Sequence, residues 1–159
     1  HAAAGDSRVQ AYDVVIGHRR EKVWNVVSRI GDGPGPLCVI GAHYDAVAGT
    51  PGADDNASAV AVLLELARLL AAAPGTAGGP VELVAYTLKF HGTDLSDHVP
   101  YQELGIPALM LGDTSHYRNP HYHAPTDLPH TLDYDRMADL TSALAGWLAA
   151  PVSAGPAPG

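Results

Sequence analysis

The sequence is poor in cysteine, in charged residues and in long apolar runs, and each shortage excludes a class of protein. Cys38 is the only cysteine among 159 residues, so the chain cannot form an internal disulfide. No apolar stretch is long enough to cross a bilayer without interruption by charge, proline or glycine. Nine lysines and arginines stand against seventeen acidic residues, and the resulting net charge of −8 argues against nucleic acid or a membrane surface as a partner.

What the sequence does contain is an alternation of strand-like and helix-like segments. Apolar runs predict strands at residues 12–16, 23–30, 37–43, 81–88 and 106–111. Helical periodicity predicts amphipathic helices at 57–72, capped by Asp55, Asn56 or Ser58, and at 135–149, capped by Asp133. This alternation indicates an α/β fold with a mixed, mostly parallel sheet. We expect one domain over residues 1–149 and a disordered tail over 150–159.

A polar fragment, GAHYD at residues 41–45, directly follows the predicted strand at 37–43. His43 and Asp45 are two residues apart in an extended segment, so their side chains point to the same side. Asp45 can therefore hold the imidazole of His43 while the other ring nitrogen binds a metal ion. A structural hydrogen bond between the two residues at the end of a strand is the alternative.

A second fragment, GADDNAS at residues 52–58, places two adjacent carboxylates before an apolar helix. One carboxylate is enough to cap a helix and to interact with its dipole, so the second favours a nearby cation. Capping alone remains the simpler alternative. A third fragment, YHAPTD at 122–127, supplies another histidine and carboxylate, His123 and Asp127.

Together with SDHVPY at 96–101, these fragments resemble, in the same order, the motifs of the double-zinc aminopeptidase family, which includes the glutaminyl cyclases. The resemblance extends from about Val9 to Trp147. It implies a three-layer α/β/α sandwich with a mixed, mostly parallel sheet, reduced here in size. It also implies zinc-dependent hydrolysis of amino-terminal peptide bonds, a peptide or aminoacyl substrate, and a secreted or periplasmic location.

The resemblance also assigns roles to individual residues. It implies that His43 binds one zinc ion, that His123 binds a second, and that Asp55 bridges the two. Asp45 would orient His43, and Tyr122 would donate a hydrogen bond to the substrate carbonyl or the tetrahedral oxyanion. Members of this family often have a cis peptide bond at the position that follows Asp54 here.

The chain departs from the family pattern at one place. In the family, the strand that matches 81–88 is followed by a Glu-Glu pair, whose first member activates water and whose second binds zinc. Here Leu88 is followed by Lys89 and then by FHGTD, so a block that includes a strand is missing. The matched ligands His43, Asp55 and His123 then suffice for one zinc ion rather than two.

Other residues are within reach in sequence to replace the missing groups. They are His91, Asp94, Asp97, His98, Asp113 and His116. Asp97 is the first choice for a surrogate ligand or a weak catalytic base, although it could instead only order its loop.

We therefore expect an aminopeptidase-type enzyme with impaired activity. The alternatives are an inactive metal-binding or partner-binding remnant, a glutaminyl-cyclase-like acyl transferase with one zinc ion, and an incomplete gene product without independent function. Loss of a strand should also leave an exposed sheet edge, through which two chains could dimerise.

Overall fold

The fold is taken from a computed structural model that describes residues 6–75, 77–86, 98–112 and 115–150. Its sheet consists of β1 (Asp6–Ile16), β2 (Arg19–Ile30), β3 (Cys38–His43) and β4 (Val81–Tyr86), in the order β1-β2-β4-β3. Its helices are η1 (Ala53–Ala57), α1 (Ser58–Ala72), α2 (Val99–Glu103), α3 (Ser115–Arg118), η2 (Pro129–Thr131) and α4 (Tyr134–Ala149).

The sheet is mixed, as predicted, but the prediction that it is mostly parallel was wrong for the described strands. β1 pairs antiparallel with β2, and β2 pairs antiparallel with β4, whereas β3 and β4 are parallel. β1 and β2 are joined by a two-residue turn, and such a hairpin connection requires antiparallel strands. β3 and β4 are joined through α1, which is the kind of crossover that a parallel pair needs.

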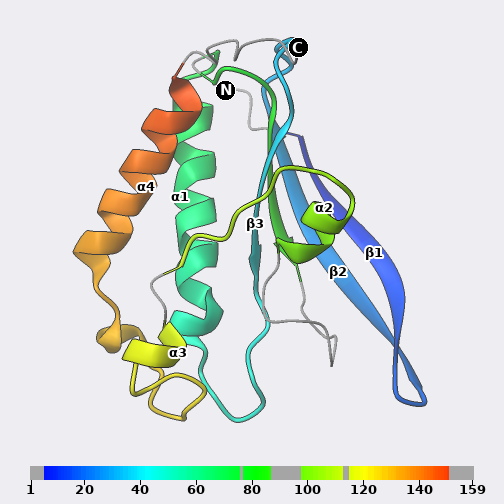
Figure 1. Ribbon diagram of the computed structural model, residues 1–159, viewed down its shortest axis with the longest axis vertical. Coiled ribbons are helices and arrows are strands. Elements are labelled where there is room, and N and C mark those ends of the chain that lie inside the picture. Colours follow the sequence, from blue (N-terminus) through cyan, green and yellow to red (C-terminus); the bar gives the residue numbers. More distant parts are fainter. Residues whose placement is uncertain (1–5, 76, 87–97, 113–114, 151–159) are drawn as a thin grey trace.

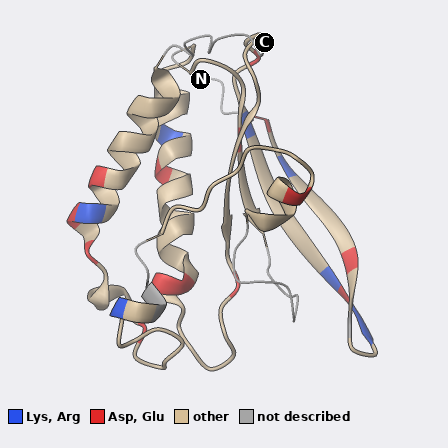
Figure 2. Ribbon diagram, viewed as in Figure 1, with Lys and Arg blue, Asp and Glu red and all other residues tan. Residues whose placement is uncertain are grey.

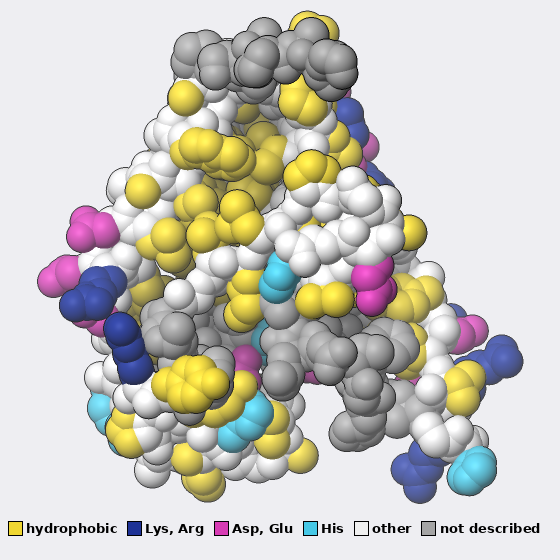
Figure 3. Space-filling model, viewed as in Figure 1, with side chains coloured by type: hydrophobic (Ala, Val, Ile, Leu, Met, Phe, Trp, Pro, Cys, Tyr) yellow, Lys and Arg dark blue, Asp and Glu magenta, His cyan; other side chains and the backbone are white. Residues whose placement is uncertain are grey.

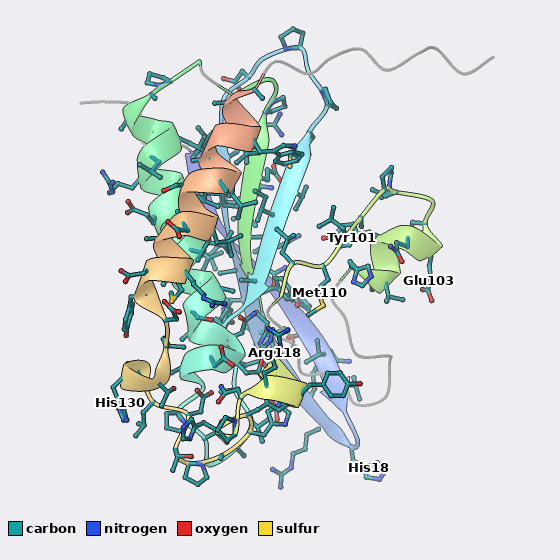
Figure 4. The ribbon with its side chains drawn as sticks, turned by 60° about the vertical axis from the view of Figure 1, so that its left-hand side comes forward. His18, Tyr101, Glu103, Met110, Arg118 and His130 are labelled. Atoms are coloured by element: carbon teal, nitrogen blue, oxygen red, sulfur yellow. The ribbon has the colours of Figure 1, made fainter. Side chains whose placement is uncertain are left out.

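The core lies between the sheet and two long helices. α1 and α4 lie side by side along one side of the sheet, and α2 lies across β3 from them (Figures 1 and 4). The buried side chains of this core are Ala42, Val62, Leu63, Leu66, Leu70, Val81, Leu83 and Leu148. A full second helical layer, which the predicted sandwich requires, is not found among the described residues.

Residues 106–111 were predicted as a strand, and the structure contradicts this. The backbone N–H of Ile106 donates to the carbonyl of Tyr101, and the side chain of Gln102 donates to the carbonyl of Ala108. These residues make local bonds in place of ladder pairing, and β3 stays the edge of the described sheet. The apolar side chains are consequently exposed, with Leu109 at 72%.

The surface reflects these features. Hydrophobic side chains gather on the upper half of one face, between the long helices and the segment that leads away from α2 (Figure 3). In the same view lysines and arginines are spread over the hairpin and the helices rather than gathered in one patch (Figure 2). Among the described residues, none of the helices has the length and apolar character needed to span a membrane.

Candidate metal centre

The centre lies where β3 ends and η1 leads into α1. The carboxyl end of a parallel strand and the start of the following helix meet at one edge of the sheet, which brings His43 close to Asp55. The connection depends on Gly52, whose φ is 68°. A Cβ atom there would lie 2.5 Å from the Cβ of Ala46 and 2.9 Å from the carbonyl oxygen of Asp55. Only glycine fits this turn without displacing the loop that carries Asp55.

The carboxylate of Asp55 lies between two imidazole rings. His43 Nε2 is 3.1 Å from Asp55 Oδ1, and His123 Nε2 is 2.8 Å from Asp55 Oδ2. The structure therefore brings together all three residues proposed as metal ligands, although His123 is far from the other two in sequence. Each carboxylate oxygen faces a different histidine, which is how a carboxylate shared by two cations would be arranged.

The hydrogen bonds of His43 show why a cation fits here. Its Nδ1 is 3.0 Å from the backbone oxygen of Asp45 and 3.5 Å from Oδ1 of the same residue. Because both oxygens are acceptors, Nδ1 carries the proton, and a neutral His43 then has a lone pair at Nε2. This lone pair would repel the anionic oxygen of Asp55. The contact is favourable only if Nε2 also carries a proton or if a cation lies between Nε2 and the carboxylate. The geometry therefore fits either a protonated His43 or a cation shared with Asp55, and the role of Asp45 in orienting His43 stays a prediction.

Electrostatics in the centre act on Asp55 and Tyr122. The pKa of Asp55 is lowered, and the main cause is the hydrogen bond with His43. Burial opposes this shift, whereas the charge of His43 and the contact with His123 add to it. Burial, followed by the negative charges of Asp55 and Asp54, raises the pKa of Tyr122. Tyr122 therefore keeps its proton and remains a hydrogen-bond donor at neutral pH.

Tyr122 and His123 form the open side of the centre. Their rings stack, with centroids 3.9 Å apart and planes at 19°. The side chain of His43 is 15% exposed and that of His123 is 44% exposed, so solvent reaches the centre from the His123 side. His123 also has a φ of 56°, which is uncommon outside glycine and occurs disproportionately at functional sites.

The three residues do not converge on one point. Among the described residues, no three His, Cys, Asp or Glu side chains are grouped so as to hold a single ion. His43 and His123 instead form two separate pairs that share Asp55, so a single zinc site with three ligands is not confirmed. The cis peptide bond joins Asp55 to Asn56, one bond later than predicted.

Several other predicted site residues are not part of this geometry. Lys89, His91, Asp94, Asp97 and Asp113 lie outside the described residues, as does the side chain of His116, so the predicted role of Asp97 stays a prediction. His98 lies immediately before α2. His121 pairs through Nδ1 with the hydroxyl of Thr126, at 2.9 Å. His130 on η2 and His18 at the tip of the β1–β2 hairpin lie on opposite sides of the molecule (Figure 4).

The predicted cap of α1 was wrong, and the correction reveals a residue that sequence reasoning missed. The N-cap is Ala57, which makes no side-chain cap, and the hydroxyl of Ser58 donates to the carbonyl of Asp54. The two oxygens of Asp127 instead accept hydrogen bonds from the backbone N–H groups of Asp54 and Asp55. The sequence marks Asp127 only as a carboxylate close to His123, because its long-range partners leave no sequence pattern. The predicted cap of α4 by Asp133 is confirmed.

Comparison with known proteins identifies the family. The profile of peptidase family M28 matches residues 25–89 and 79–148. The uncharacterized protein YfbL of Escherichia coli (strain K12) is 28% identical over 235 residues, which cover 84% of this chain and 72% of that protein. This stretch is longer than the whole chain, so YfbL has aligned residues that are missing here. The predicted gap after Leu88 falls where the two profile matches overlap.

Solved structures share the fold. The crystal structure of Fimbriiglobus ruber glutaminyl cyclase matches with a TM-score of 0.70 at 15% identity, covering 91% of this chain and 82% of that one. LapB from Legionella pneumophila matches with a TM-score of 0.62 at 21% identity, covering 91% of this chain and 60% of that one. With most of its length matched by the family profile, this chain belongs to peptidase family M28.

Proposed function

We propose that this chain is a zinc-dependent metallopeptidase of the aminopeptidase type, in which His43, Asp55 and His123 hold zinc and turnover is impaired. One observation carries the proposal: a single carboxylate faces two histidine nitrogens, while the other ring nitrogen of His43 lies 3.0 Å from the backbone oxygen of Asp45. Bound zinc would supply Lewis-acid polarisation of a substrate carbonyl and activation of water. Membership of family M28 supports hydrolysis as the reaction.

The remaining residues have supporting roles in this proposal. Asp45 holds the ring of His43 so that Nε2 faces Asp55. Tyr122 donates its hydroxyl proton in a hydrogen bond to the carbonyl oxygen of the substrate, where negative charge develops. The open side at His123 admits the amino-terminal end of a peptide or an aminoacyl group.

The proposed impairment follows from where the glutamates lie. Glu65 is bound by Arg68, and Glu82 is bound by both Arg8 and Arg29 on the sheet. Glu21 lies in the hairpin and Glu103 in α2. None of the described glutamates therefore contacts Asp55, and the same observation favours a second candidate, a zinc-binding remnant without turnover.

Hydrolysis of an aminoacyl p-nitroanilide by the zinc-loaded protein tests the proposal. We expect slow release of nitroaniline that chelation stops and that Asp55→Ala abolishes. Tyr122→Phe should lower the rate by about 10²-fold, the effect of removing one oxyanion donor. The control Tyr134→Phe removes a hydroxyl that donates to Pro129 and should leave the rate unchanged.

Each contrary result has a distinct meaning. Zinc binding without hydrolysis would overturn the enzymatic proposal in favour of the remnant. Hydrolysis that survives chelation, or that Asp55→Ala leaves intact, would overturn the role of the metal centre.

A further inference from the structure

The most deeply buried acidic residue in the described part of the chain is Asp127, which is 1% exposed. Its Oδ1 accepts a hydrogen bond from the backbone nitrogen of Asp54 at 2.9 Å, and its Oδ2 accepts one from that of Asp55 at 3.4 Å. Its backbone oxygen accepts a third bond from the nitrogen of Ala53, also at 3.4 Å. Three consecutive N–H groups of η1 thus point at one residue.

Asp127 is also rigidly linked to His123. The backbone N–H of Asp127 donates to the carbonyl of Ala124 at 3.0 Å, and that of Ala124 donates to His121 at 2.9 Å. The first of these turns in the chain, residues 121–124, contains His123, and the second, residues 124–127, ends at Asp127. His123 and Asp127 therefore belong to two consecutive turns that share Ala124.

A second tie joins the same two parts of the chain. The side-chain amide of Asn119 donates to Asp54 Oδ2 at 2.7 Å, and its carbonyl oxygen accepts from the backbone N–H of His121 at 2.9 Å. Asp54 therefore engages Asn119, whereas Asp55 engages the histidines. This division explains why two adjacent carboxylates occur here.

We propose that Asp127 is a positioning residue, which fixes the backbone of η1 so that Asp55 Oδ2 meets His123 Nε2, with Asn119 as the weaker tie. The effect of Asp127 on metal binding rests on the proposed function, whereas its effect on the contact between Asp55 and His123 does not. A carboxylate is needed because two N–H groups point at its two oxygens. An asparagine offers one acceptor oxygen and turns an NH₂ donor toward the other N–H group.

The first test uses the metal-free chain and the variant Asp127→Asn. In its crystal structure we expect His123 Nε2 and Asp55 Oδ2 to lie beyond hydrogen-bonding distance. The amide protons of Asp54 and Asp55 should exchange at least about 10-fold faster than in wild type. The matched control is Asp133→Asn, because Asp133 also accepts a backbone N–H bond, from Arg136, but at the start of α4. It should alter neither quantity.

An unchanged contact between Asp55 and His123 in Asp127→Asn would overturn the proposal. An unchanged contact would overturn the proposal even if Asp127→Asn were less stable than wild type. Lower stability with an unchanged contact would mean that Asp127 stabilises the fold without positioning Asp55. If Asp127→Asn does not fold, Asn119→Ala weakens the same connection and should lengthen the contact by a smaller amount. A contact that Asn119→Ala leaves unchanged would then overturn the proposal.

The second test measures zinc affinity by calorimetry with a competing chelator. We expect Asp127→Asn to weaken zinc binding about 10- to 100-fold, as loss of an outer partner of a metal ligand does. In the background of His123→Ala the same substitution should have little further effect, because the contact that it positions is already lost. Equal effects in both backgrounds would overturn the proposal. A wild-type chain that binds no zinc would overturn the proposed function instead, and the metal-free contact would still decide the role of Asp127.

Discussion

The candidate metal centre was predicted from short sequence fragments and a strand at residues 106–111 from an apolar run, yet the two regions differ in almost every physical respect. In the centre, polar groups satisfy one another across long sequence separations, and Asp127 is almost fully buried. In the segment at residues 104–112, Leu104 is 77% and Leu109 is 72% exposed, and the described backbone hydrogen bonds are local. The difference shows that a polar site can form from a few short fragments, whereas an apolar strand needs a neighbour.

Loss of the block predicted to be missing after Leu88 would account for this difference. The centre is assembled from the end of β3, from η1 and from residues 119–127, all of which are present. The segment at 104–112 carries the apolar pattern of a strand, but in the described sheet β3 is an edge without a further partner.

The largest contrast should appear in stability. Leu66 lies fully buried in the core, and Leu66→Ala should lower the free energy of unfolding by about 2–5 kcal/mol. Leu109→Ala makes the same chemical change at an exposed site and should stay within about 0.5 kcal/mol of wild type. Urea unfolding of both variants measures the difference. A large loss in Leu109→Ala would mean that the segment packs against something in solution.

The two adjacent carboxylates should differ in metal binding. Asp55→Ala removes the group shared by both histidine pairs and should weaken zinc binding by more than about 100-fold, beyond the range for outer partners. Asp54→Ala removes a partner of Asn119 and should weaken it only about 10-fold. Calorimetric titration distinguishes them, and equal losses would contradict the assignment of Asp55 as the shared ligand.

The turn before η1 should be sensitive to a single methyl group. Gly52→Ala adds a Cβ to a crowded site with a positive φ and should destabilise the fold by about 1–3 kcal/mol. Gly49→Ala is the matched control, because Gly49 also has a positive φ, of 87°, but its Cβ would meet nothing within 4 Å. Thermal unfolding should therefore show a smaller loss for Gly49→Ala. Equal losses would show that crowding at Gly52 does not matter.

The smallest expected effect concerns association. The edge of the described sheet at β3 favours weak dimerisation at high protein concentration, which sedimentation velocity can detect. Val39→Lys places a charge on this edge strand and should keep the chain monomeric. A wild-type chain that sediments as a monomer at every concentration would contradict the expectation.

Sequence patterns predicted the parts of the fold that local periodicity controls. α1, α4 and β3 form within one or two residues of the predicted bounds, because their apolar patterns match the faces that they bury. Residues 106–111 show the limit of such reasoning, because an apolar run forms a strand only when another strand pairs with it. The parallel character of the sheet was overestimated because the hairpin at the amino-terminal end extends it by two antiparallel pairings.

The candidate centre was predictable to a similar degree. The grouping of His43, Asp55 and His123 followed from short fragments in a known order, and the structure brings them together. Asp127 and Asn119 could not be assigned in the same way, because their partners lie 65 or more residues away and are partly backbone groups. Backbone donors have no signature in the sequence, so only the fold shows which carboxylate they meet.

The central claim is that His43 and His123 bind zinc together with Asp55. Elemental analysis of zinc per chain after dialysis tests it most directly, applied to wild type, His43→Ala and His123→Ala. We expect wild type to retain zinc and both variants to lose it while remaining folded. Absence of zinc from wild type, or the same zinc content in all three proteins, would show that His43 and His123 do not bind zinc.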